Sequence, residues 1–204
     1  MPDAVGLASN GQLWPLLGGG GLLLLIAAGV GLWRLRLRRR KDIDRRLREA
    51  CGGVLGNFVI PDGNGEQIQV QYALLTGRGI LVIDIKDVEG HVFGSEAMQD
   101  WTVLADDRRF TFPNPQPGLW DRVAAVKRLT PEVPVTGFVS FTGRARFIKG
   151  QPRSVTLLEP LLQELEREAS GGRAGPEGYL AAWERLRKAA IAPQMDHAPF
   201  STPR

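Results

Sequence analysis

The chain has few of the residues that build disulfides, metal centres or catalytic triads: among 204 residues there are one cysteine, Cys51, and two histidines. A single cysteine excludes an internal disulfide and any zinc or iron–sulfur site built from cysteines. His91 and His197 lie far apart in the sequence, so His91 is expected to be a solvent-facing or core-edge side chain rather than a metal ligand. No Ser/His/Asp or Cys/His triad can be assembled from this sequence.

Positive charge is concentrated in one short stretch. The segment from Arg34 to Arg48 contains nine basic and two acidic residues, a net charge of +7. The whole chain carries +4, so the other 189 residues carry −3. A surface broadly coated with basic residues is therefore excluded, and the arginine run itself is either a topology signal or a patch that binds lipid or DNA.

A long uncharged run precedes the basic stretch. Leu13–Trp33 contains 21 residues without a charge, and as a helix it would rise about 31 Å, the thickness of a bilayer core. Trp14 and Trp33 stand near its two ends, where aromatic rings favour the membrane interface. The positive-inside rule predicts a single-pass anchor in the inner (plasma) membrane, with residues 1–12 outside and the chain after Arg34 in the cytoplasm. A cleaved signal peptide, the alternative, lacks its basic n-region.

The rest of the chain shows short helical and strand-like patterns. Helices are expected at Asp42–Leu55, Leu119–Leu129, Leu157–Glu166 and Tyr179–Ile191. Strands are expected at Asn57–Pro61, Gln67–Thr76, Ile80–Lys86, Trp101–Ala105, Arg108–Phe112 and Thr136–Phe141. The turn residues Asp62–Gly65 and the loop Asn114–Gly118 separate some of these elements. A helix, an antiparallel meander, a helix, a strand and a helix in this order predict an α+β fold.

The composition of the cytoplasmic part suggests five segments. They are a basic juxtamembrane segment (34–48), a folded domain (46–168), a linker (169–178), an amphipathic helix (179–191) and a disordered tail (192–204). Within the folded domain, Trp101 and Trp120 are expected to fill the core.

Asp84 and Lys86 end a β-branched strand. Because strand side chains alternate, both point to the same face as Val82, while Ile83 and Ile85 point to the other. A carboxylate placed there can hold a divalent cation, and the ammonium can stabilise a phosphate charge or steer an attacking water. The same pattern is also common as an exposed ion pair worth well under about 1 kcal/mol.

Five motifs follow one another through the middle of the chain: Asn57–Gly63, Gln67–Gln71, Thr76–Lys86, Gly90–Ser95 and Trp101. In this order, from about Arg46 to Phe141, they resemble the nuclease-related domain (NERD) family, part of the restriction-endonuclease-like superfamily with PD-(D/E)xK sites. The resemblance implies a restriction-endonuclease-like mixed sheet flanked by helices, here preceded by a single transmembrane helix. It also implies a site that would use Mg²⁺ or Mn²⁺.

In that family a helix glutamate, a strand acid and an E-x-K pair form the presumed active site. Asp84 and Lys86 match the E-x-K pair, with aspartate in place of glutamate, and Glu49 is the candidate for the helix acid. The position of the strand acid holds Gln71. The missing carboxylate removes a full negative charge, so affinity for Mg²⁺ or Mn²⁺ should fall sharply.

A later N-P-x-x-Q motif of the family is matched only in part. Asn114 and Pro115 match it, whereas Gly118 stands at the position of its glutamine. Three nearby acids could replace missing ligands but are expected to be a turn former and two solvated loop charges: Asp62, Asp87 and Glu89.

Three functions remain open at this point. The departures from the family pattern favour a catalytically impaired nuclease-fold module that binds nucleic acid or a protein partner on the cytoplasmic face of the membrane. The alternative is an active metal-dependent, membrane-tethered nuclease that uses Asp84 and Lys86. The third is a membrane-assembly component whose anchor and C-terminal helix, with Trp183, contact the partner.

Overall fold

The computed structural model describes residues 29–31, 34, 41–106, 108–171 and 176–192. The chain divides into two compact units, Met1–Arg45 and Arg46–Arg204, and the boundary falls within a helix over residues 41–50. Within the described ranges no helix is both long and apolar enough to cross a bilayer. The span predicted at Leu13–Trp33 and the tail predicted at 192–204 lie almost wholly outside these ranges.

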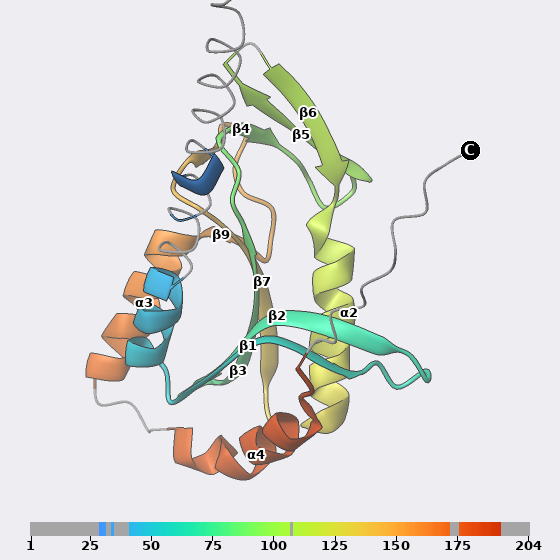
Figure 1. Ribbon diagram of the computed structural model, residues 1–204, viewed down its shortest axis with the longest axis vertical. Helices are drawn as coiled ribbons and strands as arrows, with labels where there is room; N and C mark the ends of the chain where they lie inside the picture. The colour runs from blue at the N-terminus through green and yellow to red at the C-terminus, as the bar shows by residue number, and fades with distance from the viewer. Residues whose placement is uncertain (1–28, 32–33, 35–40, 107, 172–175, 193–204) are drawn as a thin grey trace, which may run out of the picture. The chain divides into compact units, whose positions relative to one another are not determined.

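The Arg46–Arg204 unit contains a five-stranded mixed sheet in the order β1-β2-β3-β7-β9 (Figure 1). Its strands are Gly53–Pro61, Gln67–Thr76, Gly79–Lys86, Val135–Phe141 and Val155–Leu157. The strands β1, β2 and β3 pair with one another in antiparallel fashion, whereas β3 pairs with β7, and β7 with β9, in parallel. The expected mixed sheet is confirmed. The antiparallel meander is confirmed for β1, β2 and β3, and the parallel pairs arise because long connections return the chain to this sheet.

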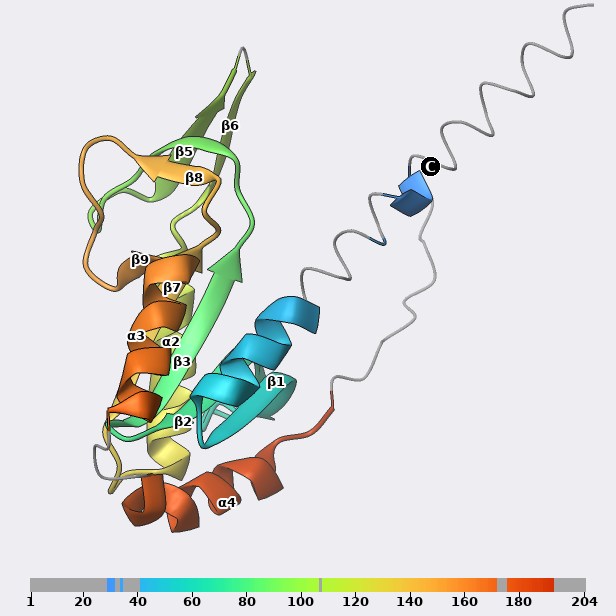
Figure 2. The same cartoon turned by 90° about the vertical axis from the view of Figure 1, so that its left-hand side faces the viewer.

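A second sheet of four strands has the order β6-β5-β4-β8. In chain order its strands are β4 Gly90–Phe93, β5 Asp100–Ala105, β6 Arg108–Pro113 and β8 Ala145–Phe147. The predicted hairpin between β5 and β6 is confirmed, and Asp106 takes a positive φ of 50° in its turn. Figure 2 shows this hairpin projecting beyond the rest of the unit.

Helices cover the two faces of the five-stranded sheet (Figure 1). They are α2 Pro115–Leu129, α3 Leu158–Ser170, the short 3-10 helix η1 Pro176–Tyr179 and α4 Leu180–Ala189. α2 lies against one face, where Gly137 of β7 allows close approach: a Cβ there would lie 2.6 Å from Val123. α3 covers the other face and buries four leucines, Leu158, Leu161, Leu162 and Leu165.

The helix that precedes β1 is held against α3 by one arginine. The Arg46 guanidinium lies 2.8 Å from a carboxylate oxygen of Glu159 and 3.1 Å from one of Glu166. These hydrogen-bonded carboxylates, Glu159 foremost, hold the pKa of Arg46 above its usual range. Leu47, on the same turn, is fully buried. Residues 46–50 are therefore held in the Arg46–Arg204 unit by both charge and packing.

Two predicted helices end earlier than expected. The first was expected to reach Leu55, but it ends at Ala50 and Gly53 already begins β1. The last was expected to reach Ile191, but α4 ends at Ala189, and Ile191 exchanges two backbone hydrogen bonds of 2.9 Å with Val59. β1 has a free edge there, and pairing with that edge satisfies backbone groups that a longer helix would satisfy internally.

Three tryptophans, Trp101, Trp120 and Trp183, have different environments. Trp101 is fully buried, and its ring lies 6.1 Å from that of Phe141 in a stacked pair, so its core role is confirmed. Trp120 is 46% exposed, and its predicted core role is wrong. Its neighbour Leu119 is fully buried, and successive helix residues point about 100° apart. Trp183 is buried against Gly53, so the partner-binding role considered for it does not fit.

Cys51 should react slowly with thiol reagents in the folded protein. Burial, together with the charge of Glu168, raises the pKa of its thiol to about 12. The loss of thiolate at pH 8 outweighs the greater nucleophilicity of the remaining thiolate, so we expect modification at least ~10-fold slower than in urea. Timed labelling with a chromogenic disulfide reagent measures both rates. Equal rates would show that the thiol is not shielded as the fold indicates.

Candidate functional site

Asp84 is a buried carboxylate that faces α2. It lies near the end of β3, where strand alternation places it on the same face as the core residue Val82. Its side chain is only 5% exposed, and one carboxylate oxygen, Oδ2, lies 3.0 Å from Nη1 of Arg122 in α2. The predicted face of Asp84 is therefore observed, whereas its burial and its partner Arg122 were not predicted.

Arg122 is fixed by more than this ion pair. Its Nε donates a hydrogen bond of 2.7 Å to the carbonyl of Gln69 in β2, so the guanidinium bridges β2 and β3. The side chain is 27% exposed, which leaves part of it accessible to water. The charge of Asp84 is thus balanced by a cation of the protein itself.

Gln71 has a structural task beside Asp84. The β2–β3 ladder ends at the pair Tyr72–Ile83, one step before Gln71 would face Asp84. There the Gln71 side-chain oxygen accepts a hydrogen bond of 2.6 Å from the backbone N–H of Ile85. The amide thus satisfies a donor that the strands leave free where they separate.

Lys86 is the last residue of β3 and is half-buried. It shares the face of Asp84 by alternation, as the sequence pattern predicted. Its backbone carbonyl accepts a hydrogen bond of 3.1 Å from the N–H of Thr142. Within the described residues its ammonium forms no ion pair. Lys86 is thus the member of the predicted pair whose charge is not engaged by the fold.

Glu49 is not brought to Asp84 by the fold. It is exposed on the helical turn 46–50, whereas Leu47 and Ala50 of that turn are buried. This turn is bound through Arg46 to α3, on the face of the sheet opposite α2 (Figure 1). Asp84 points to the α2 face instead. The matching of Glu49 to the helix acid of the family stays a prediction that this geometry does not favour.

Asn114 and Pro115 begin α2 rather than forming the loop that was expected. The Asn114 side-chain oxygen accepts a hydrogen bond of 3.0 Å from the backbone N–H of Gln116, which is a helix N-cap. Proline is well suited to the first helical position, where no amide hydrogen is needed. Gly118 then lies one turn before Arg122, and a Cβ there would lie 3.0 Å from Nη1 of Arg122. The motif therefore positions the helix that carries the partner of Asp84.

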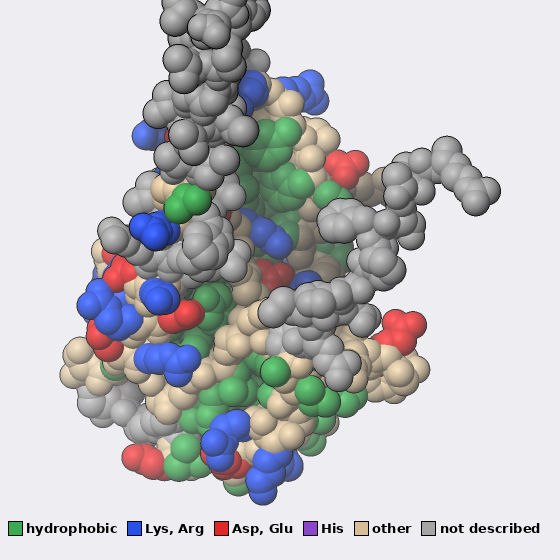
Figure 3. Space-filling view, viewed as in Figure 1, with side chains coloured by type: hydrophobic (Ala, Val, Ile, Leu, Met, Phe, Trp, Pro, Cys, Tyr) green, Lys and Arg blue, Asp and Glu red, His purple; other side chains and the backbone are tan. Residues whose placement is uncertain are grey.

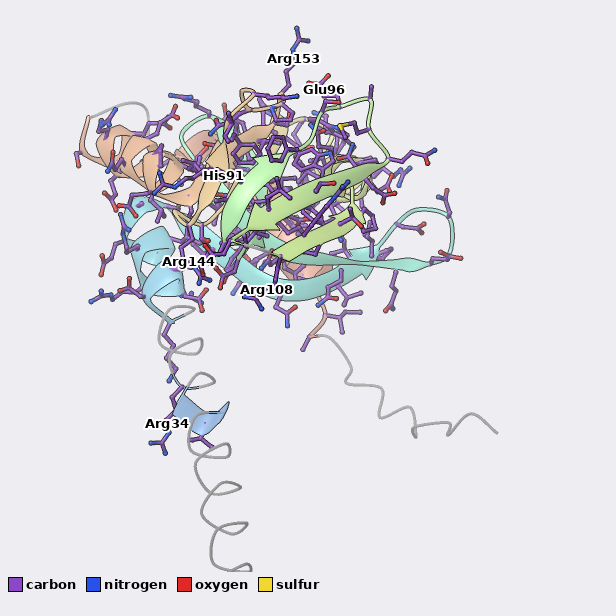
Figure 4. All side chains as sticks on the ribbon, turned by 90° about the horizontal axis from the view of Figure 1, so that it is seen from above. Arg34, His91, Glu96, Arg108, Arg144 and Arg153 are labelled. Atoms are coloured by element: carbon purple, nitrogen blue, oxygen red, sulfur yellow. The ribbon has the colours of Figure 1, made fainter. Side chains whose placement is uncertain are left out.

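Gln116 is a buried polar residue that the sequence did not single out. Its Nε2 donates a hydrogen bond of 2.6 Å to the carbonyl of Arg153, in the loop before β9. The backbone N–H of Arg153 in turn donates to the carboxylate of Glu96 at 3.0 Å, and Figure 4 shows these two residues together at one side of the unit. Gln116 thus fastens the start of α2 to the loop over the second sheet.

The other acids considered as ligands are used elsewhere. The Asp62 carboxylate accepts hydrogen bonds from the backbone N–H groups of Asn64 and Glu66, which hold its pKa below the usual value and confirm it as a turn former. Asp87 and Glu89 each lie 2.6 Å from Arg144. Figure 3 shows acidic and basic side chains next to one another, surrounded by apolar side chains, in the middle of the face that it draws.

The donors present do not fit a catalytic Mg²⁺ or Mn²⁺ ion. Such ions need several oxygen ligands, with at least one or two carboxylates free to coordinate. Asp84 is paired with Arg122, Gln71 is bound to the backbone, and Glu49 lies elsewhere. In the described part of the chain, no three side chains of His, Cys, Asp or Glu come together.

A comparison with protein families identifies the family of the chain. The family model described as nuclease-related domain (NERD) matches residues 37–142, just over half of the 204-residue chain. The matched segment includes β1 to β6 and all of α2 and β7, and so contains Asp84 and Arg122. No curated protein and no solved structure matches the chain.

Proposed function

This chain belongs to the nuclease-related domain (NERD) family, and on that premise we propose that it is a nuclease-fold module that has lost metal-dependent hydrolysis and acts by binding. The bound species is nucleic acid or a protein partner. The proposal places the module on the cytoplasmic face of the inner (plasma) membrane, anchored through Leu13–Trp33. The uncharged run and the arginines after it support this placement.

The contact between Asp84 and Arg122 carries the proposal. A divalent cation at Asp84 would have to displace a guanidinium that lies 3.0 Å away and is also bound to Gln69. The arginine supplies positive charge where the cation would supply it, so the carboxylate is satisfied without metal. A carboxylate whose charge is balanced in this way is not available to hold the cation that would activate water.

Gln71 supports the same conclusion independently. An amide oxygen is a weaker ligand for a hard cation than a carboxylate, and this oxygen already accepts a hydrogen bond from the N–H of Ile85. This hydrogen bond of 2.6 Å uses one of the two lone pairs of the oxygen, so only the other could face a cation. Both oxygen donors at this end of β3 are therefore engaged by the protein.

The full-length protein, purified in a mild detergent, should bind Mn²⁺ no more tightly than its Asp84→Asn variant. It should also leave supercoiled plasmid intact in the presence of Mn²⁺. Calorimetric titration and gel analysis of the plasmid measure the two properties. Asp84→Asn retains the shape of the residue, and a thermal melt of both proteins shows whether each is folded.

The opposite result would identify an active enzyme. Nicking by the wild type that is lost in both Asp84→Asn and Lys86→Ala would overturn the proposal. It would establish instead a metal-dependent nuclease in which Arg122 moves aside. The ammonium of Lys86, which forms no ion pair with the residues that the structure describes, is the feature that such a result would explain.

A further inference from the structure

The four-stranded sheet has one buried and one open face. Trp101 and Val103 of β5, Val92 of β4 and Ala145 of β8 are buried and belong to the main core. Because strand residues alternate, the residues between them point the opposite way. In the described part of the chain these opposite residues are exposed or only half-buried, so this face lies outside the core.

Four exposed side chains form a row across this open face. The register pairs Arg109 of β6 with Leu104 of β5, Leu104 with His91 of β4, and His91 with Arg146 of β8. All four are exposed. Neighbouring strands lie about 4.8 Å apart, so the two arginines stand roughly 14 Å apart at either end of the row. Figure 4 looks down on this sheet and shows His91 beside β4.

A second row lies one step along the strands. It consists of Thr111, Thr102 and Phe93, which the register places opposite one another. Phe93 is two residues after His91 on the same strand, so the two rings share one face. The open face therefore combines two flat rings with hydroxyl groups and is bounded by arginines.

The charge on this face differs from that of the remaining domain. Its charged strand residues are Arg109, Arg146 and Asp100, a net +1, because Arg108 alternates to the opposite face; the residues outside Arg34–Arg48 carry −3 together. The aspartate, Asp100, lies four residues from the row, about 13 Å along β5. Arg109 and Arg146 form no ion pair within the described residues. The nearby acids Asp87 and Glu89 are held by Arg144, and Asp106 lies in the hairpin turn.

We propose that this open face of the β6-β5-β4-β8 sheet binds single-stranded nucleic acid. The inference builds on the proposed function, because it supplies a ligand and a surface for a module that binds without cutting. Arg109 and Arg146 contact phosphates at the two ends of the row, and His91 and Phe93 stack on bases between them. Sheets that present rings and cations on one open face can bind single strands, whose bases are free to stack.

The geometry favours a single strand over a duplex or an acidic peptide. The bases of a duplex are paired and stacked on one another, so the rings of His91 and Phe93 would find no partner in it. An acidic peptide would use the arginines but gain nothing from the rings. Stacking together with phosphate contact is therefore the property that distinguishes the proposed ligand.

The test measures the binding of a fluorescent 12-nucleotide oligothymidylate to the full-length protein in detergent, by anisotropy at several salt concentrations. The double variant Arg109→Ala/Arg146→Ala should bind at least tenfold more weakly. Its slope of log affinity against log salt should be smaller by about 1.4, because each phosphate contact on a single strand contributes about 0.7. His91→Ala should lose at least fivefold, with an unchanged slope.

A matched double variant removes the same charge elsewhere. Arg187→Ala/Lys188→Ala changes two exposed residues in the last turn of α4 and should bind like the wild type. Equal losses in the two double variants, tighter binding of the corresponding duplex, or equal competition by polyglutamate would each overturn the proposal. Plasmid nicking is measured separately. Nicking would reject the proposed function, but it would not decide whether the open face binds single-stranded nucleic acid.

Discussion

Replacing Arg122 with alanine is expected to lower the free energy of unfolding by about 3 kcal/mol. The substitution leaves the carboxylate of Asp84 with its side chain 5% exposed and without its cation. It also removes the donor to the carbonyl of Gln69. Loss of one member of a buried ion pair costs far more than the pair contributes, because the remaining charge stays desolvated.

An exposed ion pair provides the comparison for this effect. Arg144 binds Asp87 and Glu89, but its side chain is 41% exposed. Arg144→Ala should therefore cost less than about 1 kcal/mol. Urea unfolding of the full-length proteins, followed by tryptophan fluorescence, measures both differences. If the two variants were equally destabilised, Asp84 would not depend on Arg122 as the geometry indicates.

A third variant separates the charge from the packing. Replacing both partners, as in Asp84→Leu/Arg122→Met, removes the buried charge together with its counterion. We expect this double variant to be more stable than Arg122→Ala alone, since buried ion pairs can be replaced by apolar side chains of similar volume at little cost. If both variants were equally destabilised, the loss of stability would come from the missing packing of the aliphatic part of the arginine side chain instead.

The sequence predicted the local elements better than their pairing. The strand Ile80–Lys86 and the hairpins around Asp62–Gly65 and Asp106 are set by nearby residues, namely alternation along the strand and turn formers at its ends. The parallel pairing of β3 with β7 depends on a long connection that holds a second sheet and α2. No short-range pattern contains that information.

The same limit explains what was missed at the site. Asp84 and its orientation follow from the strand pattern, but Arg122 is on a helix distant in the sequence, and the helix was predicted to begin too late. Asn114 followed by Pro115 is a helix-start signal as well as a loop signal. If the helix is taken to begin at Pro115, Arg122 lies two turns after its start and close to the Asn114–Gly118 motif. Its positive charge would then have suggested it as a partner for Asp84.

We expect that the single substitution Gln71→Asp does not create a metal site. Arg122 would neutralise the new carboxylate as it neutralises Asp84, and the shorter side chain would lose the hydrogen bond from Ile85. In Gln71→Asp/Arg122→Gln, two carboxylates lie near one another without a cation between them. Like charges this close repel, and a divalent ion relieves the repulsion. We expect Mn²⁺ to bind this double variant at least ~10-fold more tightly than the wild type, a difference of about 1.4 kcal/mol.

The two effects of this double variant should appear together. Without metal its melting temperature should fall, and Mn²⁺ should raise it again by mass action, whereas wild-type melting should not respond. Calorimetry and thermal melts measure the two responses, and Gln71→Asp/Arg144→Gln, which removes an arginine from an exposed pair, is the matched control. A gain of affinity in Gln71→Asp alone, equal to that in the double variant, would show that Arg122 does not block the cation. If only the double variant responds, two features prevent metal binding in the wild type: the guanidinium of Arg122 and the missing carboxylate at Gln71. Both must change before the ion can bind.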